Sequence, residues 1–311
     1  MAITNYPNGF ANGVSIRGLP ILNAYGGNVY WVDSGAGADT GKGTENSPFA
    51  TLDYAIGRCT ANNGDIIMVK AGHAETLTTG VAFDIAGITV VGLGNGDGRP
   101  AFTVNAAVNG FSITADDIGI HNVRMITGSS VTAATRFIRI AASDIELSGL
   151  KTEMTYDMYH NIVVVSGDDI LIRDSQFFNT VTTAASVHPQ KCILNISGTN
   201  VIVRNCRFND TRASKTERWR MCVAGGALAS NLVVEDCTFI CRGEATNTRS
   251  AGASDGAGEN SPTMATMFCR AISPSANTAV GTIFNMKYGY QIECYDVAAV
   301  NKLAVVSPTM A

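Results

Sequence analysis

Residues 200–208 read Asn-Val-Ile-Val-Arg-Asn-Cys-Arg-Phe, and residues 231–239 repeat this pattern as Asn-Leu-Val-Val-Glu-Asp-Cys-Thr-Phe. Four earlier stretches share its first half, so the same apolar positions occur six times along the chain. The aliphatic residues that begin the six copies are Ile88, Ile118, Ile145, Ile170, Val201 and Leu232. Each is followed two positions later by a second aliphatic residue, and this period of two predicts a β-strand in every copy.

Successive copies are 30, 27, 25, 31 and 31 residues apart, which are the differences between those residue numbers. A strand that recurs at such a period predicts a solenoid whose coils stack on one shared core. We therefore predict an all-β fold, specifically a right-handed parallel β-helix.

Two further sets of inward side chains are expected in each coil. A second strand is predicted before four of the copies, separated from them by a four-residue corner, with the inward pairs Phe111/Ile113, Ile138/Ile140, Val163/Val165 and Leu194/Ile196. Five positions after the first residue of each copy, the core is predicted to hold Leu93, Val123, Leu150, Ser175, Cys206 and Cys237. In the last three copies a phenylalanine follows two positions later.

The residue before each copy is acidic or an amide in five cases: Asp117, Asp144, Asp169, Asn200 and Asn231. Such side chains bond to nearby backbone and tolerate tight turns, so we predict a polar ladder along one corner of the solenoid. Asp116-Asp117 and Asp168-Asp169 resemble catalytic carboxylate pairs. Their position in the repeat favours a role in the turn instead.

Four segments are predicted along the chain. They are an extended N-terminal arm at 1–28, the β-helix with its N-terminal cap at 29–242, a flexible loop at 243–262, and a C-terminal β-rich cap or interface segment at 263–311. The cap at the start is expected to be an amphipathic helix that Ser47 caps and Pro48 begins, because Phe49, Leu52 and Ile56 follow at helical spacing.

Composition narrows the possible functions. The chain carries 22 Lys and Arg against 26 Asp and Glu, a net charge of −4, which gives little support to a nucleic-acid partner. The longest apolar runs are too short for a membrane span, and the first residues do not resemble a signal peptide. The eight cysteines include no Cys-x-x-Cys pair, and we expect free thiols instead of a metal site. No cofactor is expected.

The histidines are His73, His121, His160 and His188. None lies beside a nucleophile in a recognisable motif, and their nearest acids in the sequence are corner residues. We expect surface or turn roles for them and name no catalytic residue.

The outward positions of the repeated strand differ in character. Three positions after the first residue stand Val91, His121, Ser148, Arg173, Arg204 and Glu235, which include a single acid. One position after it stand Thr89, Gly119, Glu146, Leu171, Ile202 and Val233. Leu171, Ile202 and Val233 predict an outward aliphatic stripe, which favours a subunit interface unless a loop of the same chain covers it.

Several motifs resemble a known class of proteins. Ser-Pro-Phe-Ala-Thr-Leu at 47–52, Gly-Asp-Ile-Ile at 64–67 and the repeated Ile/Val-x-Ile/Val-x-Asn/Asp-Cys-x-Phe resemble right-handed parallel β-helix proteins of the pectin-lyase-like class. The resemblance covers residues 29–242. It implies the fold but not the function, because this scaffold carries many kinds of site.

A narrower resemblance involves Tyr-Pro-Asn-Gly-Phe-Ala-Asn-Gly-Val-Ser-Ile-Arg-Gly at 6–18 and Asp-Tyr-Ala-Ile-Gly-Arg-Cys-Thr-Ala-Asn-Asn-Gly-Asp at 53–65. Both are similar to structural proteins of tailed bacteriophages, some of which are trimeric β-helical cement, or decoration, proteins. The resemblance implies a non-enzymatic homotrimer, made in the host cytoplasm, that binds the major capsid protein on the virion surface. In the arm, Tyr6, Phe10, Ile16, Leu19 and Ile21 are the candidate capsid contacts.

Two other functions remain open. Many β-helices cleave acidic polysaccharides, so the runner-up is a virion-associated polysaccharide depolymerase, either a lyase or a hydrolase similar to a tailspike. A non-enzymatic tail fibre or adaptor is the third possibility.

Overall fold

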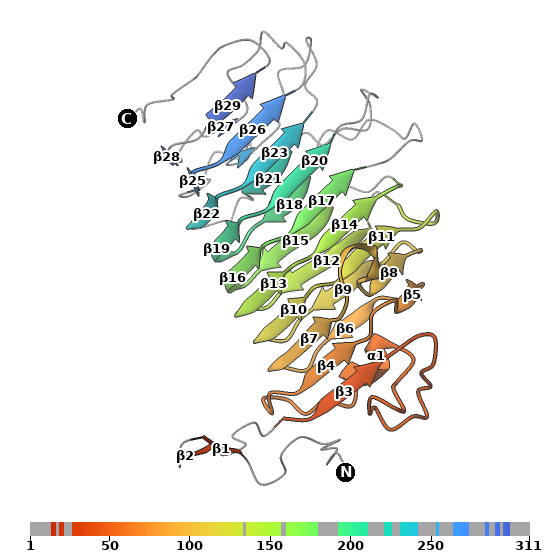
Figure 1. The fold of residues 1–311 in the computed structure, drawn as a ribbon. Helices are drawn as coiled ribbons and strands as arrows, with labels where there is room; N and C mark the ends of the chain where they lie inside the picture. Colours follow the sequence, from red (N-terminus) through yellow and green to blue (C-terminus); the bar gives the residue numbers. More distant parts are fainter. Residues whose placement is uncertain are drawn as a thin grey trace.

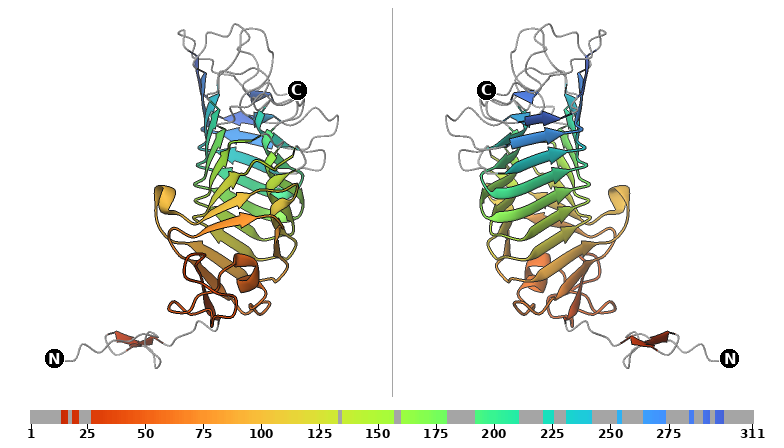
Figure 2. Two further views of the ribbon diagram at one scale, coloured as in Figure 1. Left: turned by 90° about the vertical axis from the view of Figure 1, so that its right-hand side faces the viewer. Right: turned by 90° about the vertical axis from the view of Figure 1, so that its left-hand side faces the viewer.

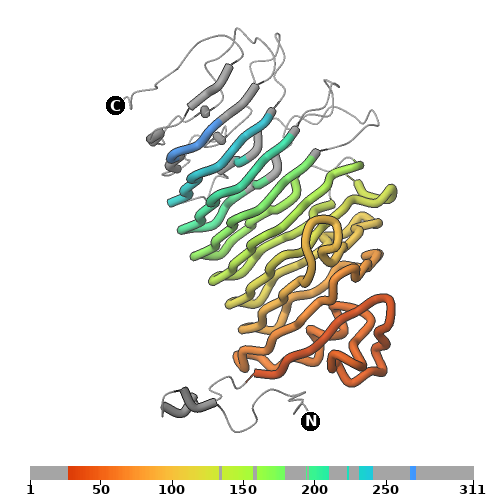
Figure 3. Tube along the Cα trace, viewed as in Figure 1, coloured from red at the N-terminus to blue at the C-terminus, as the bar shows by residue number. Residues whose placement is uncertain are grey.

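The chain forms a column of stacked coils (Figure 1). The computed structural model describes residues 27–132, 135–156, 160–179, 192–210, 221–225, 231–241 and 264–273, together with short strands at 14–16, 19–21, 253–254, 284–285, 290–292 and 295–298. Three parallel sheets of ten, nine and eight strands run along the column, and successive strands of the chain enter them in turn. Figure 2 shows the sheets from two sides, and Figure 3 traces the coils from the N-terminal end in red. The predicted parallel β-helix is therefore confirmed.

The first sheet contains the six repeated strands that the sequence predicts. Its members in chain order are β3 (Val29–Val32), β4 (Ile66–Val69), β7 (Ile88–Gly92), β10 (Ile118–His121), β13 (Ile145–Ser148), β16 (Asp168–Arg173), β19 (Thr199–Arg204), β22 (Leu232–Glu235), β25 (Met264–Met267) and β28 (Tyr290–Ile292).

The second and third sheets complete each coil. The second sheet consists of β5 (Ala74–Leu77), β8 (Ala101–Val104), β11 (Arg124–Thr127), β14 (Lys151–Met154), β17 (Gln176–Asn179), β20 (Arg207–Asp210), β23 (Thr238–Cys241), β26 (Arg270–Ser273) and β29 (Tyr295–Ala298). The third consists of β6 (Val81–Phe83), β9 (Asn109–Ile113), β12 (Arg136–Ala141), β15 (His160–Ser166), β18 (Cys192–Ile196), β21 (Met221–Gly225), β24 (Ala253–Ser254) and β27 (Phe284–Asn285).

Equivalent residues of successive coils lie directly above one another. Ile118 pairs with Ile88 on one side and Ile145 on the other, and Ile145 pairs with Ile170, which pairs with Val201. All five side chains are buried in one continuous core. The phenylalanines behave in the same way: the rings of Phe177, Phe208 and Phe239 stack with centroids 4.9 Å apart, the spacing of neighbouring strands.

The predicted polar ladder lies at the corner between the third and first sheets. Asp117, Asp144, Asp169, Asn200 and Asn231 all have φ between 53° and 59°, the left-handed region that Asp and Asn enter more readily than other side chains. The Asn200 side-chain amide donates to Asp169 Oδ1 at 3.1 Å, and that of Asn231 donates to Asn200 Oδ1 at 3.0 Å. The turn role assigned to Asp117 and Asp169 is thereby confirmed.

A second ladder, which we did not predict, occupies the corner between the first and second sheets. Its residues with positive φ are Asn122, Gly149, Asp174, Asn205, Asp236 and Phe268. The residue after each, including Val123, Cys206 and Cys237, points into the core. The sequence contains a signal for this ladder. Asn205 and Asp236 precede the inward residues Cys206 and Cys237, just as Asn200 precedes the inward residue Val201 at the other end of the strand.

Two of the expected core positions are wrong because the corners differ in length. Leu93 is half-buried. Because Ala101 pairs with Arg124, the buried residue of this coil that is equivalent to Val123 is Pro100 and not Leu93. Residues 93–99 are thus an insertion that contains the short 3₁₀ helix η1 (Gly96–Gly98). In β15 the register shifts after Ile140, so Ile162 and Val164 point inward, while Val165 is 38% exposed. The predicted inward pair Val163/Val165 is one residue out of phase.

The N-terminal cap is shorter than predicted. The helix α1 (Leu52–Ile56) begins after Thr51, whose hydroxyl accepts a hydrogen bond from Tyr54 N, and Ser47 lies in an extended segment. Phe49 N donates to Trp31 O, which holds this segment along β3 and delays the helix. Leu52, Ala55 and Ile56 are buried in the core at the first coils, so the helix still covers that end.

The three sheets continue beyond the predicted end at residue 242. Met264 pairs with Leu232, and Cys269 repeats the buried position of Cys237 five residues after the start of its strand. The later strands β27, β28 and β29 extend the same sheets. The end of the predicted C-terminal segment, residues 299–311, lies outside the described residues. In the arm, β1 (Val14–Ile16) and β2 (Leu19–Ile21) form an antiparallel hairpin in which Ile16 pairs with Leu19.

A buried carboxylate fastens the beginning of the column. Asp65 accepts hydrogen bonds from Asn28 N at 2.6 Å, from Thr60 N at 2.7 Å and from the side-chain amides of Asn28 and Asn63. Burial alone would raise the pKa of Asp65, but these four hydrogen bonds outweigh it and hold the pKa below its ordinary value.

Replacing Phe208 by alanine should reduce the free energy of unfolding by about 3 to 5 kcal/mol, because the ring fills the middle of the aromatic stack. Chemical denaturation monitored by circular dichroism measures this loss. The matched control is Phe178→Ala, whose ring lies on the outer side of the neighbouring strand and is half-buried. Equal losses for the two variants would contradict the stacked core.

Replacing Asp65 by asparagine should cost about 1.5 to 3 kcal/mol at neutral pH, because bonds to the charged acceptor are lost. Since the folded protein lowers the pKa of Asp65, the carboxylate stabilises the fold above its unfolded pKa and loses this effect as the pH falls through the folded pKa. The difference between wild type and Asp65→Asn in thermal unfolding should therefore shrink in acid. The exposed Asp84→Asn is the control, and a difference that grew in acid would refute the assignment.

Candidate functional site on the outer face of the first sheet

The outer face of the first sheet carries two parallel columns of side chains. One column holds Val29, Ile66, Thr89, Gly119, Glu146, Leu171, Ile202 and Val233, and the other holds Trp31, Met68, Val91, His121, Ser148, Arg173, Arg204 and Glu235. The first column is apolar at both ends, whereas the second is apolar only at its start and polar or charged from His121 onward. This face is our candidate site.

The predicted aliphatic stripe exists as three neighbouring side chains. Leu171 pairs with Ile202, and Ile202 pairs with Val233, so the side chains follow one another at about 4.8 Å up the sheet. All three are half-buried. The structure therefore brings together the three residues that the sequence singled out, and water still reaches part of each.

A second apolar group, which we did not predict, lies at the start of the same face. Val29 is 46% exposed, and Trp31, Ile66, Met68 and Val91 beside it are half-buried. The six aligned copies begin at Ile88, so they do not include the outward residues of β3 and β4. Their alternation is nevertheless visible in Val29–Val32 and Ile66–Val69.

Ion pairs neutralise the charged residues of this face. Arg173 holds Glu146 through Nε at 2.8 Å and Nη2 at 2.7 Å, and its Nη1 contacts Asp174 Oδ2 at 2.5 Å. One coil further on, Arg204 Nε contacts Glu235 Oε1. The pairs join neighbouring coils, so they tie the stack together while leaving little net charge beside the stripe.

His121 lies at the centre of the face. Its Nδ1 is 2.6 Å from the hydroxyl oxygen of Ser148 on the next coil, and its ring lies over Gly119, where a Cβ would stand 2.9 Å from Nε2. Burial lowers the pKa of His121; the carboxylate of Glu146 raises it and Arg173 lowers it further, with a net shift below the ordinary value. At neutral pH the uncharged form of the imidazole is therefore favoured, and Nδ1 shares a hydrogen bond with the serine hydroxyl.

This arrangement corrects the expectation that the acids nearest to the histidines are corner residues. Glu146 influences His121 from a strand position of the same face, one coil away. Sequence reasoning missed the group because it compared each column separately, whereas His121 and Glu146 belong to different columns. Reading both columns across adjacent coils would have found it.

His73 and His160 are buried, which contradicts a surface role, although His73 does close a turn by donating from its backbone N to Lys70 O. His73 accepts a hydrogen bond from Ser34 N at Nδ1, and its Nε2 lies 3.2 Å from Glu75 Oε2, which also accepts from Leu52 N. His73 therefore joins the cap to the first coils. His160 is also buried, and His188 lies outside the described residues.

The second sheet carries a separate ionic cluster. Lys151 Nζ lies 2.7 Å from Asp97 and 2.8 Å from Glu153, and Arg124 lies 2.6 Å from Glu153. Hydrogen bonds to Lys151 lower the pKa of Asp97, and the four groups hold the inserted segment against the sheet.

Within the described ranges, no three His, Cys, Asp or Glu side chains are arranged to hold a metal ion. In the same part of the chain, no helix is long and apolar enough to cross a membrane.

The described cysteines Cys59, Cys206, Cys237 and Cys269 are free thiols. Cys206, Cys237 and Cys269 are buried, and each thiol donates to backbone carbonyls of its own corner. Burial raises the pKa of Cys237 well above its ordinary value, so the thiol is inert.

No family model matches the sequence, and no curated protein matches it significantly. Among solved structures, the chain is similar to a rhamnogalacturonan lyase, with a TM-score of 0.54 and 17% identity over 79% of this chain and 69% of the lyase. It is also similar to the GH136 lacto-N-biosidase from Eubacterium ramulus, with a TM-score of 0.51 and 11% identity over 86% of this chain and 58% of that enzyme. Identities this low show a shared parallel β-helix fold.

The imidazole of His121 should titrate below the ordinary value of 6.5, because burial disfavours its charged form. Its ring proton chemical shifts, followed by NMR against pH, measure the midpoint. Glu146→Gln should lower the midpoint further, since it removes the charge that favours the imidazolium. A midpoint above 6.5, or an upward shift in the variant, would show that the group is assembled differently.

Proposed function

We propose that the chain is a non-enzymatic structural protein of a tailed-bacteriophage virion, a homotrimeric cement protein that binds and stabilises the shell of the major capsid protein. The observation that carries this proposal is the half-buried stripe of Leu171, Ile202 and Val233 on a rigid, in-register sheet. Contiguous apolar surface of this kind is typical of contacts with another macromolecule.

The chemistry of the surrounding face also supports an interface. The Arg173–Glu146 and Arg204–Glu235 pairs leave the neighbourhood of the stripe nearly neutral, so a partner can cover it without burying isolated charge. In each corner pair that resembles a catalytic carboxylate pair, the second member, Asp117 or Asp169, occupies a turn position with positive φ. These features favour contact over hydrolysis.

The assignment to a virion rests on sequence resemblance. The stretches at 6–18 and 53–65 are similar to tailed-phage structural proteins. On this proposal Leu171, Ile202 and Val233 contact another copy, and Tyr6, Phe10, Ile16, Leu19 and Ile21 reach the capsid. The hairpin pairs the backbones of Ile16 and Leu19. The side chains of all five arm residues lie outside the described residues.

The proposed mechanism is preorganisation. Each coil is fixed by hydrogen bonds to the coils above and below, so the column loses little conformational entropy when it binds. Contacts that span neighbouring capsid subunits would then slow the opening of the shell.

The His121 group favours a second candidate, a virion-associated polysaccharide depolymerase. The imidazole of His121 lies 2.6 Å from the Ser148 hydroxyl, and Glu146 and Arg173 lie beside it. Together these side chains are able to move a proton and to bind an acidic sugar. The fold is shared with a rhamnogalacturonan lyase and a lacto-N-biosidase. A tail fibre or adaptor stays within the structural class.

Ile202→Asp should weaken assembly at least about 100-fold, because about 3 kcal/mol of apolar burial is lost on contact. Light scattering coupled to size exclusion should report monomers with an unchanged circular dichroism spectrum. The control is Ile240→Asp, an equally half-buried outward residue on the second sheet. An intact trimer in Ile202→Asp would rule out the stripe as the interface.

The structural and enzymatic candidates differ in copy number and activity. Quantitative gels of purified virions should give hundreds of copies for a cement protein, against a few trimers per tail for a depolymerase. Incubation with host polysaccharide should release no new reducing ends or unsaturated products. Cleavage by wild type that His121→Ala abolishes would replace the cement proposal with the depolymerase.

A further inference from the structure

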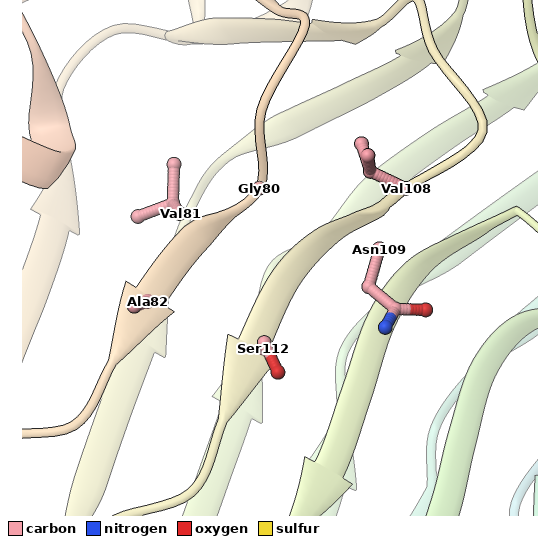
Figure 4. A pocket seen from close by; sticks show the side chains of 6 residues that line it. All are labelled: Gly80, Val81, Ala82, Val108, Asn109 and Ser112. Atoms are coloured by element: carbon pink, nitrogen blue, oxygen red, sulfur yellow. The ribbon is translucent and has the colours of Figure 1, made fainter.

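The outer face of the third sheet bears a cationic group beside a shallow depression. On this face Ala82, Ser112, Arg139 and Val163 occupy one column, and Asn109 pairs with Arg136 in a second. The depression, of about 310 Å³, is lined by Gly80, Val81, Ala82, Val108, Asn109 and Ser112. Figure 4 shows these residues on β6, β9 and the segments leading into them. Small side chains on two strands thus leave room next to the arginines of the following strand.

Among the residues that the structure describes, Arg136 and Arg139 have no counter-charge. Both are half-buried, and among the described residues neither forms a hydrogen bond or an ion pair. Burial lowers the pKa of Arg136, and the nearby charge of Arg139 lowers it further. Two half-buried cations that repel one another are costly, and an anionic partner would remove that cost.

The neighbouring corner carries the opposite charge. The exposed carboxylates there are Asp116, Asp117, Asp144, Asp168 and Asp169. Within the described ranges none of them takes part in an ion pair, although Asp116 and Asp169 accept hydrogen bonds from Ser143 N and the Asn200 side chain. Five negative charges therefore lie along the edge where the third sheet meets the first.

The two groups of charge lie at the same level of the column. Asp144 follows β12, which carries Arg136 and Arg139, and the other carboxylates belong to the coils directly before and after it. A rotation axis parallel to the column keeps every coil of one copy level with the same coil of the next. Turning one copy about such an axis can therefore place the acidic corner opposite the arginines.

The apolar residues agree with the same approach. On the third sheet Val163, which pairs with Arg139, is buried, but Val165 two residues later is 38% exposed. On the other partner, Leu171 follows Asp169 by two residues and begins the aliphatic stripe. An approach that matches acid to arginine thus also brings apolar side chains of the two faces toward one another.

We propose that the outer face of the third sheet, around Arg136 and Arg139, is the docking surface for the acidic corner of a second copy of this chain. The contact is heterologous, since the two copies use different surfaces, and a threefold axis parallel to the column closes the ring. The inference rests on the proposed function only in taking the chain to be a homotrimer.

Charge reversal tests this contact. Arg136→Glu combined with Arg139→Glu, and separately Asp116→Lys combined with Asp168→Lys, should each weaken trimer formation at least about 100-fold. All four substitutions in one chain should restore it to within about tenfold of wild type. Light scattering over a range of concentration and salt gives the association constants, and thermal unfolding verifies that each variant folds.

The matched control places the same charge change on another face. Arg207→Glu combined with Arg270→Glu alters two exposed arginines of the second sheet and should leave the trimer intact. If both reversal sets remain trimeric while Ile202→Asp dissociates, the docking surface is wrong although the homotrimer stands. A wild-type chain that is monomeric at every concentration would remove the homotrimer itself. Trimers that persist in the arginine variant while its binding to an oligouronate is lost would make these arginines a glycan site and overturn the proposal.

Discussion

The whole structure depends on keeping parallel strands in register from coil to coil. A slip of one residue would turn the inward side chains of a strand outward, so each corner must return the chain to the same phase. Residues in the left-handed region at both ends of the first sheet achieve this, and most of them are Asp or Asn. Their side chains also bond to one another along the ladder, as Asn200 does to Asp169. Local turn chemistry thereby fixes a long-range pattern.

Where the corners are uniform, the sequence predicted the fold well. The strands after Asp117, Asp144 and Asn200 have the expected inward residues, because each corner has the same length. Errors arose where one residue or a short segment was added, as at Val165 and at residues 93–99. Such additions leave the composition of the repeat unchanged, so periodicity alone does not reveal them.

The site was predictable only in part, for a different reason. Leu171, Ile202 and Val233 form a column of equivalent positions, which an alignment of the repeats reveals directly. The contact between His121 and Ser148, and the approach of Glu146, join different positions on different coils. Their geometry depends on side-chain direction across the sheet, which no single column contains. The same reason applies to Arg136. That no described residue carries a charge to pair with it follows from the positions of its neighbours in space, which the sequence does not give.

The inserted segment between β7 and β8 bears on how such a chain can change over time. Residues 93–99 leave and rejoin the coil without altering the pairing of Ala101 with Arg124. Lys151 and Arg124 hold the excursion from outside, through Asp97. Corners of the column can therefore gain or lose residues during evolution without a change in the inward side chains. The surface can diverge in this way while the core, and the stability that depends on it, stays the same.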